Sequence, residues 1–312
     1  MTRIVFILFF GLLVLSAGCA KRAEPEPTFE ETLPEPHRAF RGLVIDEGWE
    51  NDFSDYRQVL EKARRGRVNV VLLPLDDGAT TDTLNAAAEA VREAHQIGFH
   101  VHLMERMRGE GALPRDANWW KLVRRWTGAS GWLMREHGDS FFRKLREENE
   151  TAWIGISGKA STGLVDYRLG TTPVEDMVDI LNGVPDDAML PPGFEGWVVA
   201  EEELDSVPKN LPPAILPRRE SIPGTEWRER PRVVLNQAGR RVEWSAPFNT
   251  EPAGWVLYWR GAGRGGIETL PAARRSLAFE PGMFVEFIAV RGIGPDGELG
   301  PAGALWVSGL ID

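Results

Sequence analysis

Three apolar segments alternate with two amphipathic segments between residues 40 and 104, and this alternation constrains the fold more than any other feature. Residues 42–46, 68–75 and 99–104 are almost wholly apolar and predict buried strands. Residues 54–65 and 81–96 place apolar side chains at helical spacing, and a glycine follows each. A strand–helix order with short connections predicts parallel strands. The N-terminal part is therefore expected to be an α/β domain.

The pattern weakens after residue 104. Residues 119–126, 139–147 and 173–181 predict helices, whereas 153–157 and 196–200 predict strands. This makes five strands in about 180 residues, where a full (β/α)₈ barrel takes roughly 250. We therefore expect a reduced, TIM-barrel-like domain over residues 38–206.

The C-terminal part predicts short strands separated by Gly and Pro turns. The expected strands are residues 232–236, 240–245, 254–260, 275–279, 283–291 and 304–308, with a Gly-rich turn at 264–266. Trp244, Tyr258 and the Phe287/Ala289 side of a later strand are spaced to meet between two sheets. Residues 231–312 are therefore expected to form an all-β sandwich.

Charge and cysteine content narrow the classes of partner. The formal net charge is −10, so the surface repels the phosphates of nucleic acids, and we expect no nucleic-acid partner. The chain has one cysteine, which excludes an internal disulfide. We expect no metal site and no cofactor.

That cysteine, Cys19, ends a short leader. Arg3 precedes an apolar run from residue 4 to 15, and Ser16-Ala17-Gly18 precede the cysteine. This order is typical of a signal peptide, and the run is too short for a spanning helix of about 20 residues. Leu-Ser-Ala-Gly-Cys resembles the lipobox of bacterial lipoproteins. The resemblance implies cleavage after residue 18 and acyl chains on Cys19, which would attach the protein to a membrane.

Two segments predict extended linkers. Residues 19–37 are rich in Glu and Pro, which favours a tether between the lipid and the folded part. Residues 207–230 are rich in Pro and predict a linker between the domains. Together with the lipobox, the tether indicates a protein of the cell envelope, at the outer membrane facing the periplasm or at the cell surface.

Each of the three predicted N-terminal strands ends in acidic residues. Asp46, Asp76 and Glu105 stand at these ends, where parallel α/β folds bind ligands. Carboxylates there suit acid–base work on a sugar, or a metal. Each acid alone is equally explained by capping a turn. They are candidate catalytic residues, and both interpretations stay open.

Tryptophan and histidine offer further candidates. Trp49, Trp119 and Trp126 are candidates for stacking on a glycan, with core packing as the alternative. His100 and His102 project to the same side of a predicted strand, as in some metal-dependent hydrolases. Packing explains this pair better than a metal.

The N-terminal domain resembles the glycosidase-like (β/α)₈ barrel proteins of bacterial envelopes. The resemblance lies in Arg41-Gly42-Leu43-Val44-Ile45 with Trp49, in Val68-Asn69-Val70-Val71, and in the run from Ala90 through His95 and Gly98 to His102. Barrel glycosidases often have a catalytic Glu after the fourth strand. Gly158-Lys159-Ala160 follows our expected fourth strand, which argues against retaining hydrolysis.

The C-terminal domain resembles a fibronectin type III domain. The motifs are Val242-Glu243-Trp244-Ser245-Ala246-Pro247, Trp255-Val256-Leu257-Tyr258-Trp259 and Phe284-Val285-Glu286-Phe287-Ile288-Ala289-Val290. Such domains serve as spacers or binding modules.

Three function classes follow. The first is a lipid-anchored protein with a degenerate barrel that binds envelope glycan or acts as a scaffold. The second is an active glycoside hydrolase that uses the carboxylates at the strand ends. The third is a structural lipoprotein that binds protein partners through its sandwich.

Overall fold

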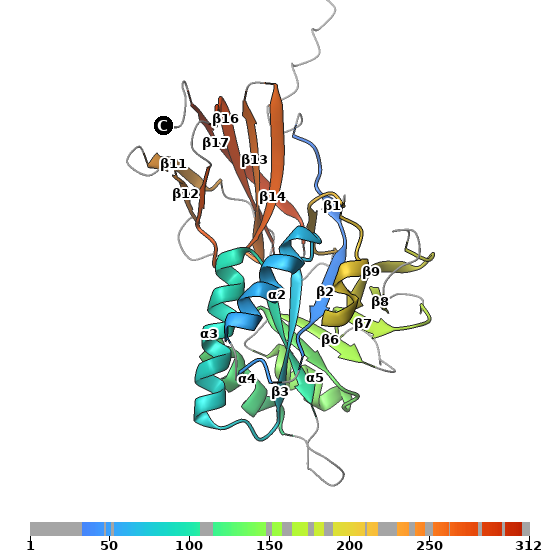
Figure 1. Cartoon of the computed structure of the whole chain (residues 1–312). Coiled ribbons are helices and arrows are strands. Elements are labelled where there is room, and N and C mark those ends of the chain that lie inside the picture. Colours follow the sequence, from blue (N-terminus) through green and yellow to red (C-terminus); the bar gives the residue numbers. More distant parts are fainter. Residues whose placement is uncertain are drawn as a thin grey trace, which may run out of the picture. The chain divides into compact units, whose positions relative to one another are not determined.

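Eight parallel strands close into a barrel in the computed structural model (Figure 1). The strands are β2 (Phe40–Val44), β3 (Val70–Asp76), β4 (His100–Arg106), β5 (Gly131–Met134), β6 (Trp153–Ser157), β7 (Tyr167–Gly170), β8 (Asp179–Asn182) and β9 (Phe194–Val199). β9 pairs in parallel with β2, Phe40 opposite Gly196, and this pairing closes the barrel. The predicted α/β barrel class is confirmed, and its topology is that of a TIM barrel.

The structure describes most of the chain beyond residue 32. The described residues are 33–46, 48–50, 53–106, 115–147, 152–157, 164–173, 178–183, 190–209, 211–217, 230–236, 241–246, 252–261, 263–279, 283–294 and 297–307. Cys19 lies outside them. Among the described helices, none is long and apolar enough to cross a membrane.

The expected count of five strands was too low. β5, β7 and β8 were missed because each has only four residues and therefore shows no clear period. The helix expected over residues 173–181 is wrong, since β8 occupies its C-terminal end. The strand at 153–157 was found with its correct bounds, but it is the fifth of the barrel and not the fourth.

Helices cover the first half of the barrel. They are α2 (Phe53–Arg65), α3 (Thr81–Ile97), α4 (Ala117–Thr127) and α5 (Asp139–Arg146), and a 3₁₀ helix, η3 (Glu201–Ser206), follows β9. Thr80 caps α3 by accepting a hydrogen bond from the Thr83 amide. The helices bury their apolar faces against the outward side chains of the strands, in a core that contains Leu60, Val91 and Trp120.

Large side chains fill the inside of the barrel. Phe40, Leu72, Trp153 and Tyr167 belong to this inner cluster and are buried. Glycines make room for them: a Cβ atom on Gly155 would lie 2.1 Å from the Tyr167 ring. The lumen is a packed core, as is usual in this fold, so a ligand site is expected at a barrel end.

A short parallel pair joins the two ends of the barrel chain. β1 (His37–Arg38) pairs with β10 (Ala214–Ile215). The buried Asn69 side chain holds this pair, because its amide donates to the carbonyls of Ala39 (2.9 Å) and Ala214 (3.1 Å). Its oxygen accepts the Arg41 amide at 2.9 Å, so both N–H donors and the carbonyl oxygen of the side chain have a partner.

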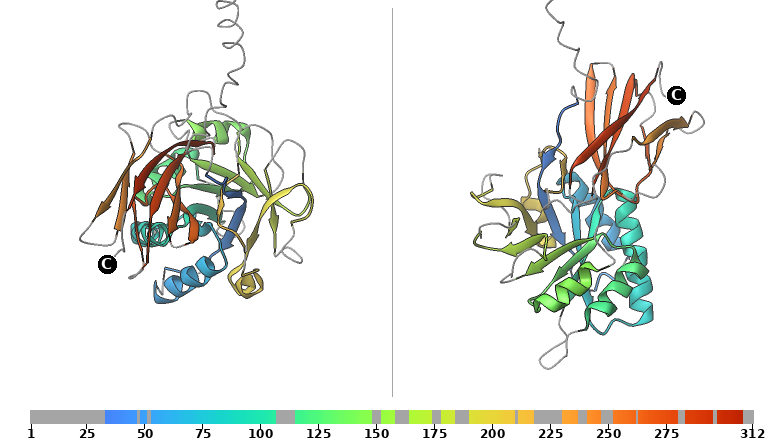
Figure 2. Two further views of the ribbon diagram at one scale, coloured as in Figure 1. Left: turned by 90° about the horizontal axis from the view of Figure 1, so that it is seen from above. Right: turned by 180° about the vertical axis from the view of Figure 1, so that it is seen from behind.

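The C-terminal part forms two antiparallel sheets, which confirms the all-β prediction. One has the order β11 (Arg232–Asn236), β12 (Arg241–Ser245), β15 (Ser276–Ala278). The other has the order β14 (Arg264–Pro271), β13 (Gly254–Gly261), β16 (Phe287–Ile293), β17 (Leu299–Trp306). Figure 2 shows both from behind. The turn expected at 264–266 is instead the start of β14, because this glycine run pairs along β13.

The core between these sheets uses the opposite face of two strands from the one predicted. Trp244 lies in it, as expected, together with Trp255, Leu257 and Ile288. Tyr258 and its cross-strand partner Ala289 are buried on the other face of the four-stranded sheet. Alternating apolar residues occupy both faces of β13 and β16, so spacing alone did not distinguish them.

Candidate functional site

Four barrel strands end in a polar residue on the inward face. These residues are the last of β3, β4, β6 and β8, namely Asp76, Arg106, Ser157 and Asn182. Side chains alternate between the two faces of a strand. An even number of residues separates each of these four polar residues from a residue of the inner cluster on the same strand, so all four face inward. The inner-cluster residues are Leu72, Met104, Trp153 and Ile180. The carboxyl end of the barrel therefore carries polar groups above an aromatic floor. We call these four residues the mouth ring.

The predicted acids lie at this end but do not converge. Asp76 stands in register with Arg106 on the adjacent strand. Asp46 lies two residues beyond β2 and is exposed. Glu105 precedes Arg106 and follows the inward Met104, so it points to the helix side of the wall. The barrel brings Asp46 and Asp76 to the carboxyl ends of neighbouring strands and separates Glu105 from both.

The Glu105 carboxylate binds residues that directly follow β5, the neighbouring strand. Its Oε2 accepts the Arg135 amide at 3.0 Å and contacts His137 Nε2 at 2.8 Å. The Glu105 side chain is only 2% exposed, and the His137 ring stacks on Phe141 with centroids 3.9 Å apart. These contacts match the capping alternative for this acid.

Glu201 is an acid of this end that the sequence interpretation missed. It begins η3, directly after β9, and its carboxylate accepts a hydrogen bond from the Asp46 amide. Burial raises the pKa of Glu201, and the neighbouring Asp46 charge raises it further. The available signal was its position in the sequence. Glu201 follows β9, which closes the barrel by pairing with β2, and Asp46 follows β2.

The exit of the fourth strand also differs from our expectation. β5 is the fourth strand, and Arg135-Glu136 follow it, in place of the expected Gly158-Lys159-Ala160. Glu136 is exposed. The argument against retaining hydrolysis from Gly158-Lys159 therefore fails, because it relied on a wrong strand count.

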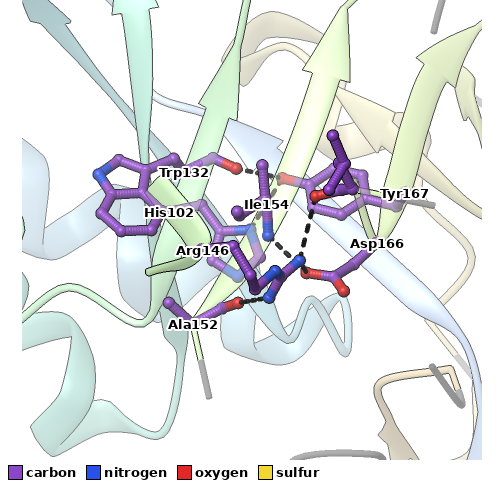
Figure 3. Close-up of polar contacts among 8 residues, drawn as sticks. His102, Trp132, Arg146, Ala152, Ile154, Asp166 and Tyr167 are labelled. Atoms are coloured by element: carbon purple, nitrogen blue, oxygen red, sulfur yellow. Dashed lines mark hydrogen bonds and ion pairs between the residues drawn. The ribbon is translucent and has the colours of Figure 1, made fainter. Parts of the chain in front are cut away.

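Below the mouth ring, a histidine and a tyrosine meet inside the lumen (Figure 3). His102 Nδ1 lies 2.8 Å from the Tyr167 hydroxyl, which also contacts the Trp132 carbonyl at 3.5 Å. The His102 ring stacks on Trp153 and is fully buried. Desolvation raises the Tyr167 pKa well above its usual value, so the hydroxyl stays protonated. His102 and Tyr167 are therefore part of the packed floor below the mouth ring.

A second polar cluster ties the start of β6 to α5 and to the residue before β7. Arg146 donates to Asp166 at 2.9 Å and to the Ala152 carbonyl at 2.8 Å (Figure 3). Asp166 also accepts the Ile154 amide at 2.7 Å. These bonds satisfy the backbone at a strand start, which is a structural role.

The three candidate tryptophans are dispersed. Trp49 is buried and donates to the Pro74 carbonyl at 3.0 Å. Trp119 is half-buried, with the Arg115 guanidinium 5.6 Å from its ring. Trp126 is 51% exposed, and its ring nitrogen donates to Asn85 on α3 at 3.2 Å. Only Trp126 has a widely exposed ring, and it stands at the opposite end of α4 from Trp119.

His100 and His102 both lie buried in β4. Burial lowers the pKa of His100 to about 3, so the ring is neutral. In the part of the chain that the structure describes, no three His, Cys, Asp or Glu residues gather as metal ligands would.

Comparison with known proteins adds little to this description. No family model matches the chain, and no curated protein matches it. A tryptophan synthase from M. tuberculosis in a ligand-free form is 10% identical, covering 54% of this chain and 85% of its own, with a TM-score of 0.38. N-(5'-phosphoribosyl)anthranilate isomerase from Pyrococcus furiosus is 12% identical, covering 55% and 100%, with a TM-score of 0.36.

An uncharacterized B. cereus protein is 11% identical, covers 80% of this chain and 93% of its own, and has a TM-score of 0.39. Likenesses of this size carry no argument about activity. The assignment of the fold rests on the closed barrel itself.

Proposed function

We propose that this protein is a lipid-anchored envelope protein whose barrel binds a glycan at the mouth ring without cleaving it. The observation that supports this best is the ring itself. It combines a carboxylate, a guanidinium, a hydroxyl and an amide on the inward face of four strands. A sugar offers both hydrogen-bond donors and acceptors, and such a mixture can pair with them.

The anchor rests on the leader. The apolar run and Leu-Ser-Ala-Gly before Cys19 support lipidation of this cysteine. Incorporation of radioactive palmitate tests this. Wild type should be labelled and Cys19→Ala should not; equal labelling of both would remove the anchor from the proposal.

The C-terminal sheets are proposed to form a fibronectin type III-like spacer. A sheet of three strands facing one of four, with Trp244 and Trp255 between them at a ring distance of 6.3 Å, supports this. A spacer would present the barrel without taking part in its chemistry.

Binding at the mouth ring is testable with a glycan array of bacterial envelope polysaccharides, probed with the full chain in detergent. We expect Asp76→Asn and Arg106→Gln each to weaken binding about tenfold, since each removes a charge-assisted hydrogen bond. Asp82→Asn, on the first turn of α3, is the matched control and should bind as wild type does. Unchanged binding in both ring variants would overturn the proposal.

Hydrolysis is the second candidate, and the Asp46–Glu201 pair favours it. A carboxyl with a raised pKa beside a second carboxylate is the arrangement of a general acid with a base or nucleophile. Glu201 would protonate the leaving oxygen. Release of reducing ends from the bound glycan, abolished by Glu201→Gln, would establish this activity. Binding without such release would support the first candidate.

A further inference from the structure

A cavity of about 60 Å³ lies beside the amino ends of β3 and β4. The residues that follow α2 and α3 line it at Arg67 and Gly98, and β10 lines it as well. The C-terminal sheets contribute Glu268 and Arg274. All these residues belong to one compact unit, Pro36–Asp312. The cavity is at the opposite barrel end from the mouth ring.

Three arginines line this cavity: Arg64, Arg67 and Arg274. Among the described residues, none of the three is in an ion pair, and the one acid of the lining, Glu268, is in none either. The lining is therefore positively charged, and its guanidinium groups have no acidic partner in the part of the chain that the structure describes.

The Arg274 side chain has a buried donor that is not used. Its Nη1 donates to the Gln96 carbonyl. Its Nε is buried and has no hydrogen-bond partner among the described residues. Buried N–H groups in folded proteins nearly all have an acceptor, so this donor calls for a ligand.

The arginines at this end of the barrel repel one another. Burial lowers the pKa of Arg274, and the charges of Arg64 and Arg241 lower it further. Burial also lowers the pKa of Arg41 to about 10, with a contribution from the charge of Arg67. All five side chains remain charged at pH 7. An anion placed among them would relieve this repulsion.

Negative charge near the cavity does not balance these arginines. Glu268 contributes one charge, and the C-terminal ends of α2 and α3 contribute roughly half a charge each. The three arginines of the lining and Arg241 contribute four positive charges. The described groups therefore leave a balance of about two positive charges.

The backbone of Arg67 gives an independent indication. Its φ is 57°, in the left-handed region, where among the described residues every other member is a glycine. The Val68 amide donates to the Ala63 carbonyl at 3.2 Å and the Arg67 amide to the Arg64 carbonyl at 3.1 Å, so α2 ends in a Schellman motif. Glycine is the usual residue at the Arg67 position, because a Cβ atom is strained there. Strain of this kind is typical of functional positions.

We propose that this cavity binds one phosphate group, either a free phosphate ion or the terminal phosphate of a larger molecule, between Arg67 and Arg274. The Nε–H of Arg274 and a neighbouring N–H form a guanidinium edge that matches two phosphate oxygens. The space has room for a few water molecules or one group of phosphate size, and pockets for whole organic ligands take roughly 300–1,000 Å³. The proposal is independent of the glycan site at the mouth ring.

Calorimetric titration of the full chain in detergent, at pH 7 and low ionic strength, tests the proposal. The probes are inorganic phosphate and glycerol phosphate, and potassium chloride of equal ionic strength is the control. We expect phosphate to bind and to raise the melting temperature more than chloride does. Equal affinity for the two probes would assign the site to the free ion, whereas tighter binding of glycerol phosphate would assign it to a phosphate carried by a larger molecule.

Two substitutions separate the site from the fold. Arg67→Gly should weaken phosphate binding about tenfold or more. Without phosphate it should melt no earlier than wild type, because glycine accepts the left-handed backbone and the repulsion of Arg41 is removed. Arg274→Gln should weaken binding to a similar extent. Arg274→Lys keeps the charge but loses the planar edge, so it should bind with intermediate affinity.

Arg65→Gln is the matched control. Arg65 is the exposed last residue of α2 and lines a different cavity, between α2 and η3, so this variant should bind phosphate as wild type does. Absence of binding by both phosphate probes would overturn the proposal. So would an equal loss in Arg65→Gln, which would indicate attraction by surface charge alone. Wild-type affinity in both Arg67→Gly and Arg274→Gln would place the phosphate elsewhere and contradict it as well.

Discussion

The two halves of the barrel are built differently. From β2 to β5, each strand is followed by a helix that buries an apolar face against it. From β6 to β9, the described residues contain no α-helix between strands. A polar pair, Arg168–Asp179, joins β7 to β8 at 2.6 Å. Burial of apolar surface and paired charge thus support the same closed sheet in different halves.

The largest expected effect comes from breaking the polar pair. Asp179→Ala leaves Arg168 in a site where both side chains are nearly buried, at 0% and 11% exposed. Removing one partner of such a pair costs about 3–5 kcal/mol of the free energy of unfolding. Urea denaturation measures this. Asp205→Ala, which breaks an exposed pair with Lys62, is the control and should cost about 1 kcal/mol or less.

Acid titration tests the helix-covered half. The folded-state pKa of His95, about 4, lies below the ordinary 6.5. Its neutral form therefore stabilises the fold fully above pH 6.5, and this contribution is lost as the pH falls toward 4. At 1.36 kcal/mol per pKa unit the loss amounts to about 3 kcal/mol. His95→Gln should flatten the stability curve over this window. Parallel curves for the two proteins would contradict the expectation.

Gly155→Ala tests the packing inside the second half, between β6 and β7. Its Cβ would lie 2.1 Å from the Tyr167 ring, so β6 or β7 must move. Overpacking of this kind costs about 1–3 kcal/mol. Gly66→Ala places its Cβ at ordinary distances of 3.4 Å and should change the melting temperature much less. Similar melting of the two variants would mean that the lumen adapts.

The smallest expected effect concerns the helix cap in the first half. Thr80→Ala removes the hydrogen bond to the Thr83 amide and should cost about 1 kcal/mol. Thr81→Ala, one residue into α3, leaves the cap intact and should be nearly neutral in the same denaturation experiment. A larger loss for Thr81→Ala would place the cap elsewhere.

The difference between the two halves of the barrel also explains which strands could be predicted from the sequence. β3 and β4 and their helices are long and periodic, so their positions were found within about two residues. β7 and β8 have four residues each, and Arg168 and Asp179 replace apolar side chains on their outer faces. No period reveals such strands, because their contacts come from partners distant in sequence.

The positions of the candidate acids were predicted in part for a related reason. Their place in the sequence put Asp46 and Asp76 at the carboxyl end of the barrel, and their role there stays a prediction. Sequence position did not identify the direction of Glu105, which depends on where the strand alternation begins. Glu201 depends on closure of the barrel, and that pairing joins residues more than 150 positions apart. Local patterns do not contain this information.

The short pair of β1 and β10 has a mechanical consequence. The chain enters β1 at residue 37 and leaves β10 at residue 215, and the two strands are parallel. Tension between the two ends therefore acts along the strands in opposite directions and loads their hydrogen bonds in shear, all at once. Asn69, the Ala39–Ile215 bond of 2.9 Å and the Arg41–Pro212 bond of 2.6 Å share this load. While this clamp holds, a pull between the two ends passes mainly through these bonds and not along the length of the barrel chain.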